Sequence, residues 1–182
     1  MARVSHIESS DDPQVQALIG KLAGGRGDRL INIYKMLLHS PRLAETWFDH
    51  IGGVRWETEL DGETREIAII RIGYLNRVDY VIAAHVMRLA APEDLTEEQC
   101  RALKDWPRSA LFSEKQRAVL ALTDAMTIDV QVPEGIIDDL RPYFSERQIV
   151  ELTVLIGAYN MHTRVLAALD IDPEPTAEGG NS

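Results

Sequence analysis

Three helix starts written into the sequence constrain the fold of this chain more than any other feature. Each pairs a hydroxyl residue with a glutamine three positions later, the spacing of a capping box, in which both side chains satisfy unpaired backbone N–H groups. The three pairs are Thr96 with Gln99, Ser113 with Gln116, and Ser145 with Gln148. Apolar residues also recur at helical spacing, and strand patterns are rare. We therefore predict an all-α protein, a helical bundle of about eight or nine helices.

The pattern divides the chain into one helical domain with short flanking segments. We predict an N-terminal arm and first helix over 1–27, the main domain over 28–169, and a mobile tail over 170–182, where the sequence is polar and contains Pro and Gly. In "IGGV" at 51–54 the glycines predict a helix end, and Asn76 predicts another. The predicted helices cover 12–23, 28–39, 41–52, 62–75, 78–91, 96–105, 113–129, 133–142 and 145–169.

Charge and cysteine content limit the classes of partner. The formal net charge of -10 opposes binding to phosphate backbones and to anionic membrane surfaces, so we expect neither nucleic acid nor membrane as a partner. The apolar stretch 149–169 is interrupted by charged and polar residues, which favours a helix inside a soluble protein. Cys100 is the only cysteine, so no intrachain disulfide can form. With no signal-peptide pattern at the N-terminus, we expect a cytoplasmic protein.

Two polar residues stand out in the most apolar part of the chain. Glu66 lies beside the buried side of the predicted helix 62–75, so its carboxylate must be paired or its pKa must rise. His85 falls on the apolar face of the next helix, together with Val81 and Ile82. Together the two residues predict a proton-handling pair. Their spacing does not force a contact, and two separately satisfied core residues remain the alternative.

The order of residues around this pair resembles the signature of the carboxymuconolactone decarboxylase family, within the alkylhydroperoxidase D-like superfamily. The matching residues are Arg65, Glu66, Arg71, Tyr80 and His85. The resemblance covers roughly residues 30–170, because the stretches 36–54, 95–103, 112–126 and 144–169 resemble the family's other helices. It implies an alkylhydroperoxidase D-like helical bundle that needs no cofactor. It also implies assembly into a homo-oligomer, a dimer, trimer or hexamer, with the last helix and His162 at a subunit interface.

The chain departs from the peroxidase members of that superfamily at the positions of their two cysteines. Those members carry C-x-x-C before the histidine, at the positions that Val78 and Val81 occupy here. Without a thiolate at either position, thiol-dependent peroxide reduction has no nucleophile. Cys100 lies on a different predicted helix and has no second cysteine to resolve it. We therefore considered a thiol peroxidase activity and disfavour it.

The resemblance implies a cofactor-independent carboxy-lyase-like enzyme acting on a small carboxylated substrate, lactone-like or derived from an aromatic compound. When carbon dioxide leaves in that reaction, the electron pair of the broken bond stays on the substrate and delocalises toward the lactone carbonyl. His85 would be the general acid/base, because imidazole titrates near neutral pH. Glu66 would orient it, and Tyr80 would donate a hydrogen bond to the oxyanion. A non-catalytic oligomeric binding or scaffold protein of the same fold is the alternative, and Tyr80 would then only pack in the core.

The same hypothesis needs a cation that binds the substrate carboxylate. Arg65 or Arg71 could supply it through bidentate pairing, although Arg65 could equally be a surface charge and Arg71 part of a buried ion pair. His50 follows two aromatic residues and is a candidate for lining the pocket. No metal-ligand spacing such as HExxH occurs, so we expect neither a metal nor an organic cofactor. The predicted partners are therefore a small-molecule substrate and further copies of this chain.

Overall fold

The computed structural model describes residues 2–24 and 28–175, except the side chains of Met87 and Arg88. In these residues the regular structure is entirely helical, which confirms the all-α prediction. The α-helices are α1 (Pro13–Ala23), α2 (Asn32–Leu37), α3 (Pro41–Trp56), α4 (Gly62–Asn76), α5 (Asp79–Ala84), α6 (Glu97–Ala102), α7 (Glu114–Asp124), α8 (Glu134–Leu140) and α9 (Glu146–Leu169). Two π-helical segments, His85–Leu89 and Ala125–Asp129, and two 3-10 segments, Ala91–Glu93 and Leu103–Arg108, complete it.

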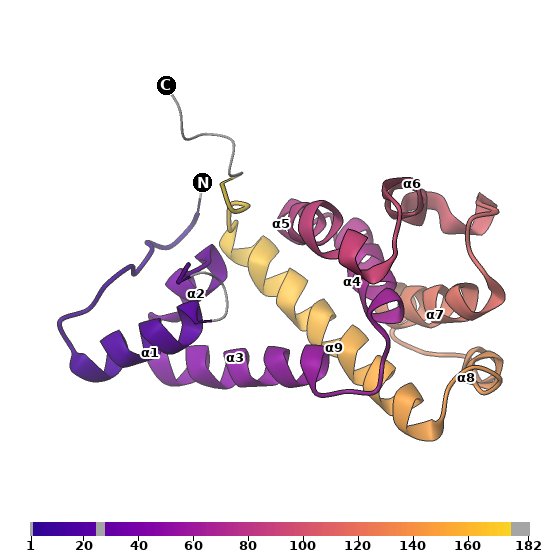
Figure 1. Cartoon of the computed structure of the whole chain (residues 1–182), viewed down its shortest axis with the longest axis horizontal. Coiled ribbons are helices and arrows are strands. Elements are labelled where there is room, and N and C mark those ends of the chain that lie inside the picture. Colours follow the sequence, from indigo (N-terminus) through magenta and orange to yellow (C-terminus); the bar gives the residue numbers. More distant parts are fainter. Residues whose placement is uncertain (1, 25–27, 176–182) are drawn as a thin grey trace.

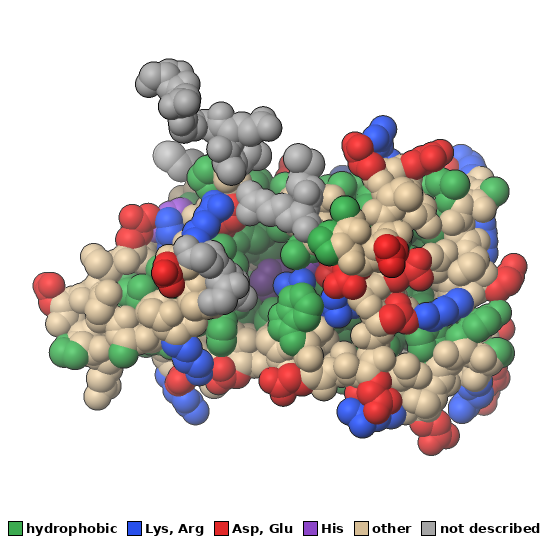
Figure 2. Space-filling view, in the orientation of Figure 1, with side chains coloured by type: hydrophobic (Ala, Val, Ile, Leu, Met, Phe, Trp, Pro, Cys, Tyr) green, Lys and Arg blue, Asp and Glu red, His purple; other side chains and the backbone are tan. Residues whose placement is uncertain are grey.

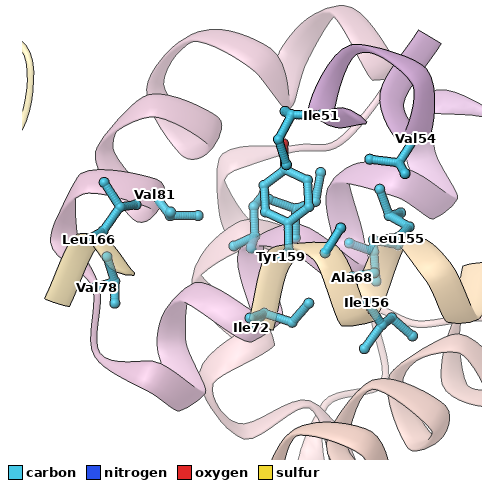
Figure 3. Packing of buried hydrophobic residues seen from close by; sticks show 14 of the residues in the cluster. Ile51, Val54, Ala68, Ile72, Val78, Val81, Leu155, Ile156, Tyr159 and Leu166 are labelled. Atoms are coloured by element: carbon cyan, nitrogen blue, oxygen red, sulfur yellow. The ribbon is translucent and has the colours of Figure 1, made fainter. Parts of the chain in front are cut away.

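Helix α4 forms the centre of the core. Every residue from Thr64 to Gly73 is buried, as expected of a helix that others enclose on all sides. It packs against α7, α9 and α5. In Figure 1 the long helix α9 runs diagonally across the molecule, with α1 to α3 at one side and α6 to α8 at the other. Figure 3 shows Tyr159 of α9 among the aliphatic side chains of this core.

All three predicted capping boxes are present. At the starts of α6, α7 and α9, the hydroxyl side chain accepts from the backbone of the third helical residue, and the glutamine of that turn accepts from the capping residue. These reciprocal bonds satisfy donors that would otherwise be unpaired at a helix start. The three helix starts predicted from the capping boxes are therefore confirmed.

The predicted helix ends were less accurate. The end predicted at 51–54 was wrong, because α3 continues through Gly52 and Gly53 as far as Trp56. Glycine lowers helix propensity by about 1 kcal/mol, which packing of α3 against α9 offsets. Helix α4 includes Asn76, and Arg77 takes the left-handed conformation instead, with φ of 56°. The helix predicted over 28–39 is confined to Asn32–Leu37.

The helix predicted over 78–91 changes type at the histidine of interest. Helix α5 ends at Ala84, and a π-helical segment begins at His85. A π-helical turn widens the helix and redirects the side chains on it, and such turns are frequent at functional sites. The change of helix type therefore affects the direction in which the His85 side chain points.

The chain after α9 folds back onto the domain. Ile171 is buried, and the Glu174 side chain is only 8% exposed. The rest of the predicted mobile tail, residues 176–182, lies outside the described residues, so its mobility stays a prediction. Across the part of the chain that is described, each helix is too short or too polar to cross a membrane.

Candidate active site

A cavity of about 510 Å³ lies between α3, α5, α9 and the segment after α9. This volume suits a small molecule. Its polar lining includes Arg55, Tyr80, His85, His162 and Glu174. In Figure 2 a hollow near the middle of the visible face has a histidine at its floor and hydrophobic and basic side chains at its rim. A shallower hollow of about 530 Å³ between α1 and α3 is lined by exposed side chains such as Lys21 and Arg42.

Glu66 and His85 meet beside this cavity. His85 Nδ1 lies 2.5 Å from Glu66 Oε2, and both residues are buried. Helix α4 carries Glu66, and the turn at Arg77 brings α5 back against α4. A Cβ atom at Gly73 would lie only 3.2 Å from Ile82 and 3.3 Å from Val81, so the glycine allows the two helices to approach closely. That approach places the Glu66 carboxylate of one helix in contact with the His85 imidazole at the end of the other.

The ionisation of this pair follows from its surroundings. Burial alone would raise the pKa of Glu66, but the hydrogen bond from His85 and the nearby positive charges outweigh it and lower the pKa. Burial lowers the pKa of His85, more than the Glu66 carboxylate raises it. An ionised carboxylate can only accept, so Nδ1 of the neutral ring carries the proton. His85 therefore has a free lone pair on Nε2, as a base requires.

Two arginines share the other oxygen of Glu66. Arg55 Nη2 and Arg65 Nε each lie 3.4 Å from Glu66 Oε1. Both guanidinium groups also stack on the ring of Trp56, at 4.4 and 4.6 Å. Arg65 is further engaged by Glu93, at 2.6 Å, and by the carbonyl oxygen of Arg55. Arg55 lines the cavity, and its buried Nε has no hydrogen-bond partner among the described residues.

The ring of Tyr159 contacts both His85 and a second histidine, His162, which Trp47 also contacts. The Tyr159 ring packs edge-on against His85, with centroids 5.7 Å apart, and lies 5.6 Å from the ring of His162. Trp47 Nε1 donates to His162 Nδ1 at 3.3 Å. Burial of Tyr159 raises the pKa of its hydroxyl, so this tyrosine stays neutral.

Tyr80 lines the cavity but is already hydrogen-bonded. Its hydroxyl donates to Glu174 Oε1 at 2.8 Å, and the same carboxylate accepts from the backbone of Asn32 and pairs with Arg29. Burial raises the pKa of Tyr80, and the charge of Glu174 raises it further. Tyr80 is thus a neutral donor in the cavity, held by the chain's own C-terminal segment.

The other predicted substrate-binding residues lie elsewhere. Arg71 makes a bidentate pair with Asp124, at 2.7 and 2.9 Å, and donates to the carbonyl oxygens of Leu103 and Lys104. His50 is exposed. The residues found to line the cavity in the described chain include none of Arg65, Arg71 and His50. Their proposed contact with substrate remains a prediction, without support from this arrangement.

The polar lining also contains Arg55, His162 and Glu174, which the sequence did not predict as site residues. The glycines at 52 and 53 predict a helix end before Arg55, whereas continuation of α3 puts Arg55 one turn after Ile51, which also lines the cavity. The sequence prediction places His162 at an interface. Its helical spacing with Leu155, Tyr159 and Leu166, all buried in α9, was the signal that places it inside the domain.

The two positions where peroxidases would carry cysteines are filled by aliphatic groups. Val78 is 6% exposed and Val81 is 1% exposed. Figure 3 shows both among the aliphatic side chains of the core, with Leu166. Cys100 is buried on α6, and burial raises the pKa of its thiol. His85, paired with Glu66, therefore faces a cavity whose lining in the described chain includes no cysteine.

The fold and site define a helical protein with a buried carboxylate–imidazole pair at a small-molecule cavity. Residues 41–125 match the model of the carboxymuconolactone decarboxylase family. The uncharacterized protein YnjA of Escherichia coli (strain K12) is 28% identical over 121 residues, a match spanning 64% of this chain and 64% of YnjA. The match over residues 41–125 and the shared fold support membership of the carboxymuconolactone decarboxylase/AhpD-like superfamily.

Solved structures share this fold at low sequence identity. An uncharacterized peroxidase-related protein with an alkylhydroperoxidase AhpD core, from Ralstonia eutropha JMP134, has a TM-score of 0.78 at 14% identity, covering 95% of this chain and 92% of its own. A variant of the debrominase Bmp8 in complex with 2,3,4-tribromopyrrole has a TM-score of 0.78 at 18% identity, covering 96% and 94%. These likenesses confirm the predicted AhpD-like helical bundle.

Proposed function

We propose that this protein is a cofactor-independent acid–base enzyme that acts on a small carboxylated substrate, lactone-like or derived from an aromatic compound. The observation that carries the proposal is the buried Glu66–His85 contact of 2.5 Å beside a cavity of about 510 Å³. Membership in the superfamily supports the same class of chemistry. Decarboxylation is the specific reaction that we propose.

Substrate binding would supply the proton that decarboxylation consumes. In the free protein His85 is neutral, with its Nε2 lone pair free. An anion bound beside the ring favours the charged imidazolium, because an opposite charge within a few ångströms raises the pKa of a histidine. His85 would thus take a proton from solvent as the substrate binds, and Glu66 would stabilise the resulting cation.

The chemical step then balances without a further reactant. The bond between carbon and the leaving carboxylate breaks, and carbon dioxide departs. The bonding electron pair delocalises into the conjugated carbonyl group, which becomes an enolate. His85 gives its proton to carbon, the carbonyl re-forms, and the ring returns to its neutral state. The solvent proton replaces the lost carbon dioxide, so charge and atoms are conserved.

Arg55 is the cation that we propose for anchoring the substrate. Its Nε is a buried donor without a partner in the described chain, and a bound carboxylate would satisfy it. Arg65 makes the same 3.4 Å contact with Glu66 but is held by Glu93 and the backbone. If Arg55 is the anchor, Arg55→Gln raises KM more than Arg65→Gln does. The reverse order would return this role to Arg65.

Turnover of carboxymuconolactone tests the catalytic proposal. We expect release of carbon dioxide by the wild-type protein, and at least a 100-fold lower kcat in His85→Gln, about the size expected for loss of a general acid. His39→Gln is the matched control, because His39 is exposed, lies outside the cavity lining and hydrogen-bonds to the backbone of Ser5. Equal kcat in wild type and His85→Gln would refute the proposal. Binding of carboxymuconolactone without turnover would favour the alternative, a non-catalytic binding or scaffold protein.

A further inference from the structure

The second histidine of the cavity has a tautomer fixed by its neighbour. An indole N–H can only donate, so the 3.3 Å contact from Trp47 Nε1 requires an unprotonated Nδ1 on His162. The proton of the neutral ring must then be on Nε2. His162 is 9% exposed and lines the cavity. Its remaining polar atom, Nε2, is therefore a hydrogen-bond donor available to a ligand.

His162 also stays neutral at the near-neutral pH at which most enzymes work. Burial lowers its pKa to about 3, and the positive charge of Arg55, and of His85 whenever that ring is protonated, acts in the same direction. The partner of Nδ1 in His162 is an indole N–H, whereas the partner of Nδ1 in His85 is a carboxylate. A neutral imidazole whose N–H is directed at a ligand is an established way to polarise a carbonyl group.

The two histidines thus carry opposite tautomers in one cavity. Glu66 forces the proton of His85 onto Nδ1 and leaves Nε2 as a base. Trp47 forces the proton of His162 onto Nε2 and leaves a donor. The ring of Tyr159 lies between them, 5.7 Å from one ring and 5.6 Å from the other. One cavity therefore holds a group that moves a proton and a group that keeps its own.

We infer that His162 is the donor that stabilises the substrate oxygen on which negative charge develops, and that Trp47 is its positioning residue. This inference rests on the proposed function for its place in the reaction. As the electron pair from the breaking bond reaches the carbonyl, the C=O π pair moves onto oxygen. His162 Nε2–H donates to that oxygen and keeps its proton. The ligand class is a carbonyl compound whose oxygen becomes an enolate or phenolate oxygen, and His162 binds that oxygen.

Substitutions of His162 separate a donor from a packing residue. In the turnover assay, His162→Phe keeps a flat ring but removes the donor, so we expect kcat to fall about 100-fold with little change in KM. His162→Gln offers an amide N–H in the same region and should recover part of the loss. A packing role predicts no recovery by Gln relative to Phe, and that result would overturn the inference.

A second measurement does not depend on turnover. The probe is 4-nitrophenol, whose anion mimics an enolate oxygen and whose absorbance reports its ionisation. We expect the wild-type protein to bind the anion and lower the pKa of the probe, and His162→Phe to lose this shift. Equal shifts, or no binding to the wild type, would overturn the inference. A shift without turnover of carboxymuconolactone would refute only the proposed function.

Nitrogen-15 spectra of histidine-labelled protein test the premise directly. The wild-type His162 should show a protonated Nε2 and an unprotonated Nδ1 from about pH 5 to about pH 8, the range far above its lowered pKa. Trp47→Phe removes the indole donor and should allow the other tautomer to appear. A protonated Nδ1 in the wild type would contradict the Trp47 hydrogen bond and overturn the assignment of the donor.

Discussion

Burial of a neutral histidine makes the folded protein sensitive to acid, and His162 gives a magnitude for this effect. Its pKa falls from the ordinary 6.5 to about 3 in the folded chain. Below pH 6.5 the unfolded chain binds a proton that the folded chain does not, so stability is lost as pH falls toward the folded pKa. Between about pH 7 and about pH 5 the loss is about 2 kcal/mol, at 1.36 kcal/mol per pH unit below the unfolded pKa.

Urea unfolding of the wild type and His162→Gln at both pH values measures this contribution. Other groups titrate equally in both proteins, including His85, whose lowered pKa acts in the same direction. We expect the wild type to lose about 2 kcal/mol more than His162→Gln over this pH step, even if the variant is less stable at both values. Equal losses would refute the neutral, buried His162 on which the donor argument depends.

Three further predictions concern other parts of the molecule. Arg71→Met should lower the free energy of unfolding by about 3 kcal/mol in urea titration, with KM unchanged, because it removes the cation that pairs with Asp124 and leaves that carboxylate the Trp106 indole as a donor; a selective rise in KM would instead restore Arg71 as a substrate ligand. Cys100→Ala should leave peroxide consumption with a thiol reductant as low as in the wild type, and a measurable loss would reinstate thiol chemistry. Glu174→Ala should lower the pKa of Tyr80 in an ultraviolet titration, because the charge and hydrogen bond of Glu174 both raise it; an unchanged titration would contradict that contact.

The fold was predictable where the sequence carries local signals. A capping box uses only side chains within one turn, so the starts of α6, α7 and α9 could be read directly. Helix ends depend more on tertiary contacts. Gly52 and Gly53 weaken α3 locally, yet packing keeps it helical to Trp56. The π-helical segment at His85 has no comparable local signature, since it arises where α5 meets α4.

The site was predictable only as far as single residues could be judged. Glu66 and His85 were conspicuous because each is a titratable group in an apolar helix, and the family signature added their order. Their contact depends on the close approach at Gly73, which no spacing rule specifies. Arg55 and His162 were missed for a related reason. Their importance comes from what surrounds them, an unsatisfied Nε in one case and an indole donor in the other.

Arg55 and Arg65 bear on the charge of His85 and on the proposed binding of an anion. Both arginines contact Glu66, and Arg65 is also paired with Glu93, so two carboxylates face the two cations. Burial is the largest cause of the lowered pKa of His85, and the positive charges of Arg55 and Arg65 act in the same direction. Under the proposed function, a carboxylate bound at the Nε of Arg55, which has no partner in the described chain, would bring negative charge beside the ring and favour protonation of His85. Proton uptake would then accompany a negatively charged ligand, and a neutral ligand of the same shape would bind without it.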